Sequence, residues 1–173
     1  MFKRAAKQEV APIGLGGGGP GGAAVLQDEL GLSQLWYLEL RLSQELARSA
    51  RTGAVFSLVA WRRQLLPGES EDPELICRAA AFIAGSLRSY DIAARLDVHR
   101  FAAILLDANA ADASTVAHRI RGDLQIRLAG AGRWQAGVAT FQRDGVDGES
   151  LIQAALRRLR EDAIGSPVTA HAA

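Results

Sequence analysis

Most of the side chains that could do chemistry lie in one run of the chain, residues 87–101. Arg88 and Asp91 stand three positions apart, and the turn-type residues Asp97-Val98-His99-Arg100 follow them. A guanidinium presents a planar fork of hydrogen-bond donors and a carboxylate presents acceptors, so the pair could bind a ligand that has both kinds of group. The aspartate and the histidine of the turn belong to residue types that bind metals or move protons.

Simpler interpretations of these residues are structural. An Arg-x-x-Asp pair is frequent by chance and is often a surface ion pair that adds little stability. His99 stands alone, because no serine or cysteine lies at the spacing expected of a nucleophile. The histidines of the chain, which show no spacing typical of a metal site, are His99, His118 and His171. The residue types alone leave both roles open for Arg88 and Asp91.

The pattern around this run predicts a β-hairpin. Residues 92–96 and 101–106 are strand-like and mostly apolar, and residues 97–100 between them are of turn type. Helical periodicity and apolar β-rich runs predict the remaining elements: helices over residues 27–51, 73–87, 110–128 and 149–163, and strands over residues 54–61 and 133–141. This order of helices and strands is typical of an α/β sandwich.

The composition is that of an ordinary globular protein. Of the 173 residues, 49% are hydrophobic and 23% are charged, which predicts one domain with a sizeable core. The net charge of +1 provides no strong field for binding nucleic acid or a membrane surface. No apolar stretch approaches the roughly 20 residues that span a bilayer, and no secretory segment is evident, so we expect a cytoplasmic protein. Cys77 is the single cysteine, so the chain can form no internal disulfide. It lies within a predicted helix, and we expect its thiol to be packed in the hydrophobic core.

Glycine dominates the N-terminal region, in the run from Gly14 to Gly22. No buried strand precedes this run and no Gly-Lys-Ser/Thr follows it, so it does not predict a phosphate-binding loop. We expect residues 1–22 to form a flexible linker, residues 23–165 to form the folded domain, and residues 166–173 to be a disordered tail.

The central run resembles the signature of GGDEF domains, which are diguanylate cyclases and their inactive relatives. These domains carry Arg-x-x-Asp, then a further arginine and an apolar residue, then Gly-Gly-Asp/Glu-Glu-Phe. The residues of this chain that stand at the matching spacings are Arg88, Asp91, Arg95, Leu96 and Phe101. The similarity extends over about residues 28–163. It implies the palm-like α/β fold of nucleotide cyclases, a mostly antiparallel central sheet flanked by helices.

In the family, Arg-x-x-Asp is the inhibitory site that binds cyclic di-GMP. The arginine fork suits guanine O6 and N7, and the carboxylate suits guanine N1–H and N2–H. Another arginine of the family's site, in the following helix, falls on about Arg119. The resemblance therefore implies a cyclic di-GMP site that consists of Arg88, Asp91 and Arg119.

The resemblance fails in the catalytic part of the signature. The turn Asp97-Val98-His99-Arg100 stands where the family has Gly-Gly-acid-Glu. The metal-binding aspartate of the family's first strand falls on about Val59, and its next acidic position falls on Trp61. Neither side chain can ligate Mg²⁺, which takes oxygen ligands. The resemblance thus implies a degenerate domain that is not an enzyme and that needs no metal or other cofactor.

From this pattern we predict a catalytically inactive GGDEF-like domain that serves as a cyclic di-GMP receptor in bacterial signalling. It would act as a homodimer or on a partner protein, without nucleic acid and without membrane insertion. The alternative is a dimerisation or protein-interaction module of the same fold that binds no nucleotide. A third hypothesis is a domain that binds GTP without turning it over.

Overall fold

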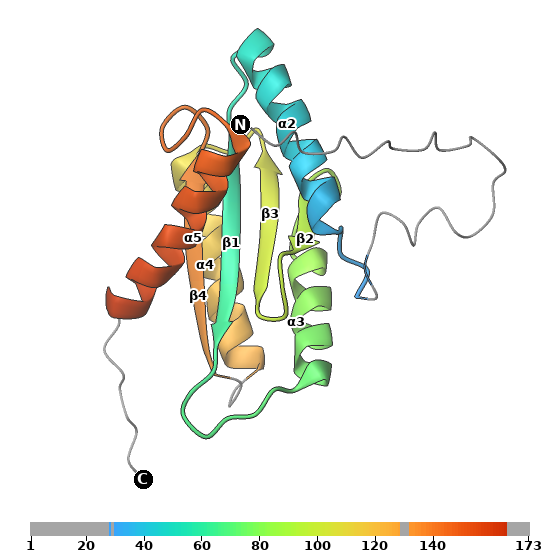
Figure 1. Cartoon of the computed structure of the whole chain (residues 1–173), viewed down its shortest axis with the longest axis vertical. Coiled ribbons are helices and arrows are strands. Elements are labelled where there is room, and N and C mark those ends of the chain that lie inside the picture. The colour runs from blue at the N-terminus through green and yellow to red at the C-terminus, as the bar shows by residue number, and fades with distance from the viewer. Residues whose placement is uncertain (1–27, 29, 129–131, 166–173) are drawn as a thin grey trace, which may run out of the picture.

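The computed structural model describes residue 28, residues 30–128 and residues 132–165 (Figure 1). The predicted linker and tail, residues 1–22 and 166–173, lie outside the described residues, so both stay predictions. The elements follow one another as α2 (Leu35–Thr52), β1 (Phe56–Gln64), α3 (Pro73–Gly85), β2 (Ile92–Arg95), β3 (Arg100–Leu106), α4 (Ala110–Arg127), β4 (Arg133–Thr140) and α5 (Gly148–Gly165). This is the element order that the sequence predicts.

The strands form a single antiparallel sheet in the order β2-β3-β1-β4. Helices α3 and α4 cover one face of the sheet and α2 and α5 cover the other, so that the sheet is the middle layer of three (Figure 1). The predicted palm-like α/β fold is confirmed. Within the described ranges, no helix combines the length and the apolar content that crossing a bilayer requires.

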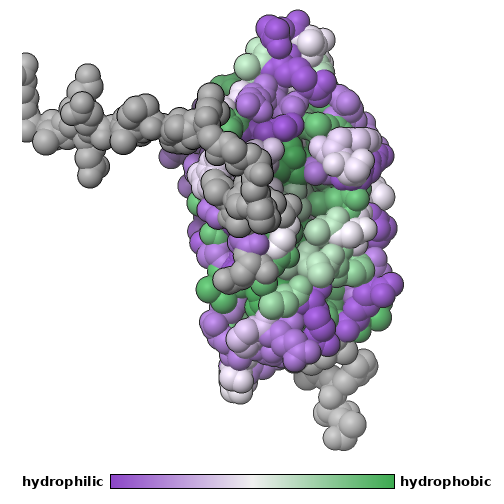
Figure 2. Space-filling view, turned by 90° about the vertical axis from the view of Figure 1, so that its right-hand side faces the viewer, coloured by the Kyte–Doolittle hydropathy of each residue, from purple (hydrophilic) through white to green (hydrophobic). Residues whose placement is uncertain are grey.

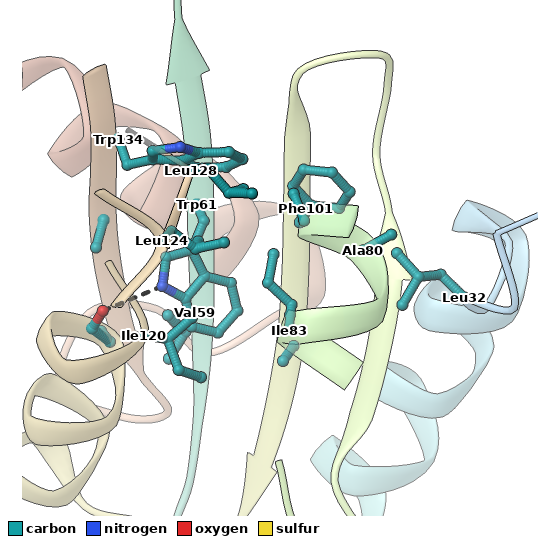
Figure 3. Close-up of a cluster of buried hydrophobic side chains, with 14 of the residues drawn as sticks. Leu32, Val59, Trp61, Ala80, Ile83, Phe101, Ile120, Leu124, Leu128 and Trp134 are labelled. Atoms are coloured by element: carbon teal, nitrogen blue, oxygen red, sulfur yellow. Dashed lines mark hydrogen bonds between the residues drawn. The ribbon is translucent and has the colours of Figure 1, made fainter. Parts of the chain in front are cut away.

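Strand β1 divides its side chains between two hydrophobic cores, because successive residues of a strand point to opposite faces. Val59 and Trp61 belong to the core under α3 and α4, whereas Leu58 and Ala60 belong to the core under α2 and α5. Figure 3 shows the first of these cores, in which the indole N–H of Trp61 donates to the carbonyl of Ala117 at 3.1 Å. The central strand is therefore buried on both faces.

Side-chain caps explain where two of the helices begin. The Asp72 carboxylate accepts a hydrogen bond from the N–H of Leu75 at 3.2 Å, with proline at the first helical position of α3. The Asn109 side chain accepts hydrogen bonds from Ala111 and Asp112 at the start of α4. These caps fix the N-terminal ends of α3 and α4, whereas the loop carrying Arg88 and Asp91 follows the C-terminal end of α3.

The first helix begins later than the sequence predicts, at Leu35 instead of residue 27. The Asp28 carboxylate accepts hydrogen bonds from the backbone N–H groups of Leu30 and Leu32, at 3.0 and 2.9 Å, and closes a turn. Gly31 occupies this turn with φ of 75°, a value that glycine adopts readily. Hydrogen bonds from the backbone to the Asp28 side chain therefore stabilise a turn here, although the apolar periodicity of the sequence favours a helix.

The prediction that Cys77 lies in the core is also wrong, because its side chain is exposed. The buried residues of α3 are Leu75, Ile76, Ala79, Ala80 and Ile83. Position 77 falls on the opposite side of a helix with 3.6 residues per turn.

Candidate functional site

A cavity of about 320 Å³ brings together the three residues that the sequence assigns to ligand binding, Arg88, Asp91 and Arg119. Arg88 and Asp91 come from the loop between α3 and β2, and Arg119 comes from α4, which lies against α3. The other residues that line the cavity are Ser86, Leu87, Leu105, Asp107, Ala108, Asp112, Thr115 and Val116.

The Asp91 carboxylate holds the loop in place. One of its oxygens accepts a hydrogen bond from the backbone N–H of Arg88 at 3.0 Å, and the other accepts from the N–H of Leu106 at 3.2 Å. The Asp91 N–H in turn donates to the Arg88 carbonyl at 3.0 Å. Since each carboxylate oxygen has two lone pairs, both can still accept a bond from a ligand.

The Arg88 side chain is exposed and does not form the ion pair that was the structural alternative for this motif. Its guanidinium lies 5.8 Å from the centre of the Tyr90 ring, within cation–π range. Among the described residues, no group forms an ion pair or a hydrogen bond with that guanidinium. Its donors are therefore available to a ligand.

Arg119 reaches the same cavity from α4. Its guanidinium donates to the carbonyl of Ser86 at 3.1 Å, at the end of α3. This bond engages one nitrogen and leaves the remaining N–H donors of the fork for other partners.

Two further carboxylates at the cavity, Asp107 and Asp112, were not predicted as site residues. Asp107 has φ of 50° and pairs with Arg48 of α2 at 3.1 Å, and Asp112 lies in the first turn of α4. A signal in the sequence existed for Asp107, which directly follows the predicted strand 101–106. Asp112 lies further along, in the predicted helix 110–128, and had no comparable signal. The cavity thus offers arginine donors and carboxylate acceptors to one ligand.

The turn between β2 and β3 lies at the opposite end of β2 from Arg88 (Figure 1). The Asp97 carboxylate accepts hydrogen bonds from the backbone N–H groups of His99 and Arg100, at 2.9 and 2.8 Å, and from the Arg100 guanidinium at 2.5 Å. Burial raises the pKa of Asp97, but these hydrogen bonds from His99 and Arg100 outweigh it and hold the pKa below the ordinary value. Asp97 therefore closes the turn upon itself.

His99 joins this turn to the loop before α3. Its Nε2 lies 2.8 Å from a carboxylate oxygen of Glu71, and its carbonyl accepts a hydrogen bond from the N–H of Arg63 at 2.9 Å. Val98, the remaining residue of the turn, is exposed. The contacts of the turn are those of a structural connection.

The residues present do not fit the Mg²⁺ that the resemblance implies for active relatives. Val59 and Trp61 are both 0% exposed and lie in the core that Figure 3 shows. Asp97 is the one carboxylate of the turn, and its oxygens are engaged by the turn's own donors. In the part of the chain that the structure describes, no group of three or more His, Cys, Asp or Glu side chains could hold a metal ion.

Comparison with known proteins identifies the fold and the family. A family model described as "Diguanylate cyclase, GGDEF domain" matches residues 66–163. The GGDEF domain of DgcB from Caulobacter crescentus, in complex with c-di-GMP, is 20% identical with a TM-score of 0.71, over 82% of this chain and 91% of that chain. The GGDEF domain of PA1120 (TpbB or YfiN) from Pseudomonas aeruginosa is 23% identical with a TM-score of 0.70, over 81% of this chain and 90% of that chain.

A further solved relative is the diguanylate cyclase SiaD in complex with its activator SiaC from Pseudomonas aeruginosa. It is 22% identical with a TM-score of 0.68, over 83% of this chain and 60% of that chain. No curated protein matches the chain.

The family corrects one prediction made from the sequence. The expectation that the chain is not an enzyme is wrong, because the matching family model is that of diguanylate cyclase, an enzyme, and a similar solved structure, SiaD, is named as a diguanylate cyclase. The family model covers more than half of the chain, and the solved GGDEF domains share its fold. This chain belongs to the GGDEF family.

Proposed function

We propose that the domain binds cyclic di-GMP in the cavity lined by Arg88, Asp91 and Arg119, and that it acts as a receptor in cyclic di-GMP signalling. The observation that carries the proposal is the convergence of these residues, which come from different elements, on one cavity. The GGDEF domain of DgcB, which has the same fold, is named as a complex with c-di-GMP. The cavity volume of about 320 Å³ lies in the range of small-molecule sites.

Each residue has a distinct role in this proposal. The free fork of Arg88 donates to guanine O6 and N7, the pairing that arginine makes with guanine in nucleic acids. The unused lone pairs of Asp91 accept from guanine N1–H and N2–H. Arg119 supplies a second cation for the anionic ligand. The turn Asp97-Val98-His99-Arg100 is a degenerate form of the family's Gly-Gly-acid-Glu and takes no part in this site.

Titration calorimetry of the full chain with cyclic di-GMP tests the proposal. We expect binding by the wild type, and Arg88→Ala should weaken it by about tenfold to a hundredfold because a bidentate contact with guanine is lost. His99→Ala, at the far end of β2, is the control and should bind as the wild type does. Absence of heat at high micromolar ligand, or undiminished binding by Arg88→Ala, would overturn the proposal.

An interaction module is the second candidate function, supported by an exposed apolar group on α2. Leu35, Trp36 and Leu40 are 40%, 43% and 44% exposed. A homodimer or a partner protein could cover these side chains. If cyclic di-GMP does not bind while light scattering shows self-association that Trp36→Glu abolishes, this function replaces the receptor.

A further inference from the structure

A second cavity, of about 440 Å³, shares Arg88 with the first, and we call it the Tyr37 cavity. Arg88, Asp91 and Leu87 line both cavities. The residues that line only the Tyr37 cavity are Gly31, Leu32, Ser33, Tyr37, Ala84, Ser89, Ile92 and Ala93. They belong to α2, α3, β2, the turn before α2 and the loop between α3 and β2. These elements lie on the side of the molecule that Figure 2 shows, where hydrophobic side chains gather between hydrophilic ones.

The Tyr37 cavity combines apolar walls with a few unused polar groups, as small-molecule sites do. Leu32, Leu87 and Ile92 supply apolar surface. Within the described part of the chain, no hydrogen bond engages the hydroxyl groups of Ser33, Tyr37 or Ser89, nor the Arg88 guanidinium. A hydroxyl both donates and accepts, so these groups can pair with either kind of edge on a base.

The charges distinguish the two cavities. Arg88 and Asp91 are the charged residues that line the Tyr37 cavity, whereas the first cavity has in addition Arg119 and the carboxylates of Asp107 and Asp112. The Tyr37 cavity is therefore the less charged of the two. A neutral planar base would find apolar walls, the Tyr37 ring and a guanidinium that stacks on aromatic faces.

We propose that the Tyr37 cavity is a second guanine subsite, which continues the cyclic di-GMP site across Arg88. The proposal rests on the proposed function. The guanine comes either from the other half of the same ligand or from a second ligand molecule, and Arg88 contacts the bases on both sides. The ligand thereby occupies both cavities, with Arg88 between them.

Blocking one cavity at a time tests the subsite. Ala84 and Thr115 are both exposed helical residues, and each lines one cavity only, Ala84 the Tyr37 cavity and Thr115 the first cavity. In calorimetry with cyclic di-GMP, Ala84→Trp should weaken binding by about tenfold at unchanged stoichiometry if both bases belong to one molecule. It should halve the stoichiometry if they belong to two molecules. Thr115→Trp, the matched variant, should abolish the binding that Arg88 and Arg119 support.

Tyr37→Phe is the conservative variant, because it keeps the ring and removes one hydroxyl, and it should weaken binding by about two- to tenfold. Circular dichroism checks that each variant is folded. If Ala84→Trp and Tyr37→Phe bind as the wild type does while Thr115→Trp does not, the subsite is wrong and the proposed function stands. If the wild type does not bind cyclic di-GMP, both fail.

Discussion

A carboxylate oxygen of Asp91 accepts a hydrogen bond from the backbone N–H of Arg88 at 3.0 Å, so the two residues of the Arg-x-x-Asp motif meet through the backbone of one and the side chain of the other. The same carboxylate reaches the N–H of Leu106, which is fifteen positions further along the chain, at 3.2 Å. The acid therefore fixes the loop to β3, and the guanidinium remains available.

Asp91→Ala should lower the free energy of unfolding by about 1–3 kcal/mol, because the N–H groups of Arg88 and Leu106 lose their acceptor. Arg88→Ala should change it by less than about 0.5 kcal/mol, since that side chain is exposed. Chemical denaturation measures both. Equal stabilities of the two variants would show that Asp91 does not hold the loop.

Gly137→Ala should destabilise the domain by about 1–3 kcal/mol or more, because β4 and α5 approach too closely for a side chain there. A Cβ at Gly137 would collide with the carbonyl of Ala155 and lie 2.9 Å from the nitrogen of Leu159. Gly122→Ala is the control. It lies within α4 with no atom within 4 Å of the added Cβ, and should stabilise the domain by about 0.5–1 kcal/mol. Thermal unfolding compares the two, and a tolerated Gly137→Ala would contradict the packing of α5 on β4.

The ion pair between Asp144 and Arg158, beside β4, should make the free energy of unfolding depend on pH in the acidic range. The Asp144 carboxylate accepts from the N–H of Thr140 at 2.8 Å and pairs with Arg158 at 2.6 and 2.9 Å, and Arg158 also donates to the carbonyl of Val138. The hydrogen bond from Arg158 lowers the pKa of Asp144, against the opposing effect of burial. A pKa that is lower in the folded state stabilises the fold above the unfolded pKa, and this stabilisation is lost as the pH falls through the folded value.

Arg158→Met should therefore lower stability at neutral pH by about 1–3 kcal/mol, and should make the loss of stability between about pH 5 and pH 2 shallower than in the wild type. Arg157→Met is the matched control, because Arg157 is 60% exposed and its partner Glu161 lies 3.7 Å away. Denaturation at a series of pH values gives both profiles. A parallel pH profile for Arg158→Met would show that the pair does not set the acid dependence.

Val59→Asp tests the position where the resemblance places a metal-binding acid. Because Val59 is 0% exposed, an introduced carboxylate would be buried in the core and should cost at least about 2 kcal/mol more than Val59→Ala. Thermal unfolding with and without Mg²⁺ measures this. A variant that is stable and that Mg²⁺ stabilises further would show that the position faces a metal site.

The sequence by itself determined the order of elements and the position of the ligand motif. The spacing of apolar residues indicates which side of each strand or helix is buried. Burial of apolar surface is the largest favourable contribution to folding. The family resemblance also comes from residues 87–101, although the inference that the chain is not an enzyme did not survive comparison with the family. Spacing within one loop was enough to place Arg88 and Asp91 together.

The tertiary structure decided which distant groups share a cavity and which polar groups are already engaged. Arg119 and Asp112 join Arg88 only because α4 packs against α3 and the sheet. The late start of α2 depends on the hydrogen bonds that the Asp28 side chain makes, and the exposure of Cys77 depends on which face of α3 meets the sheet. These outcomes depend on the directions of side chains and on long-range packing, which spacing along the chain does not encode.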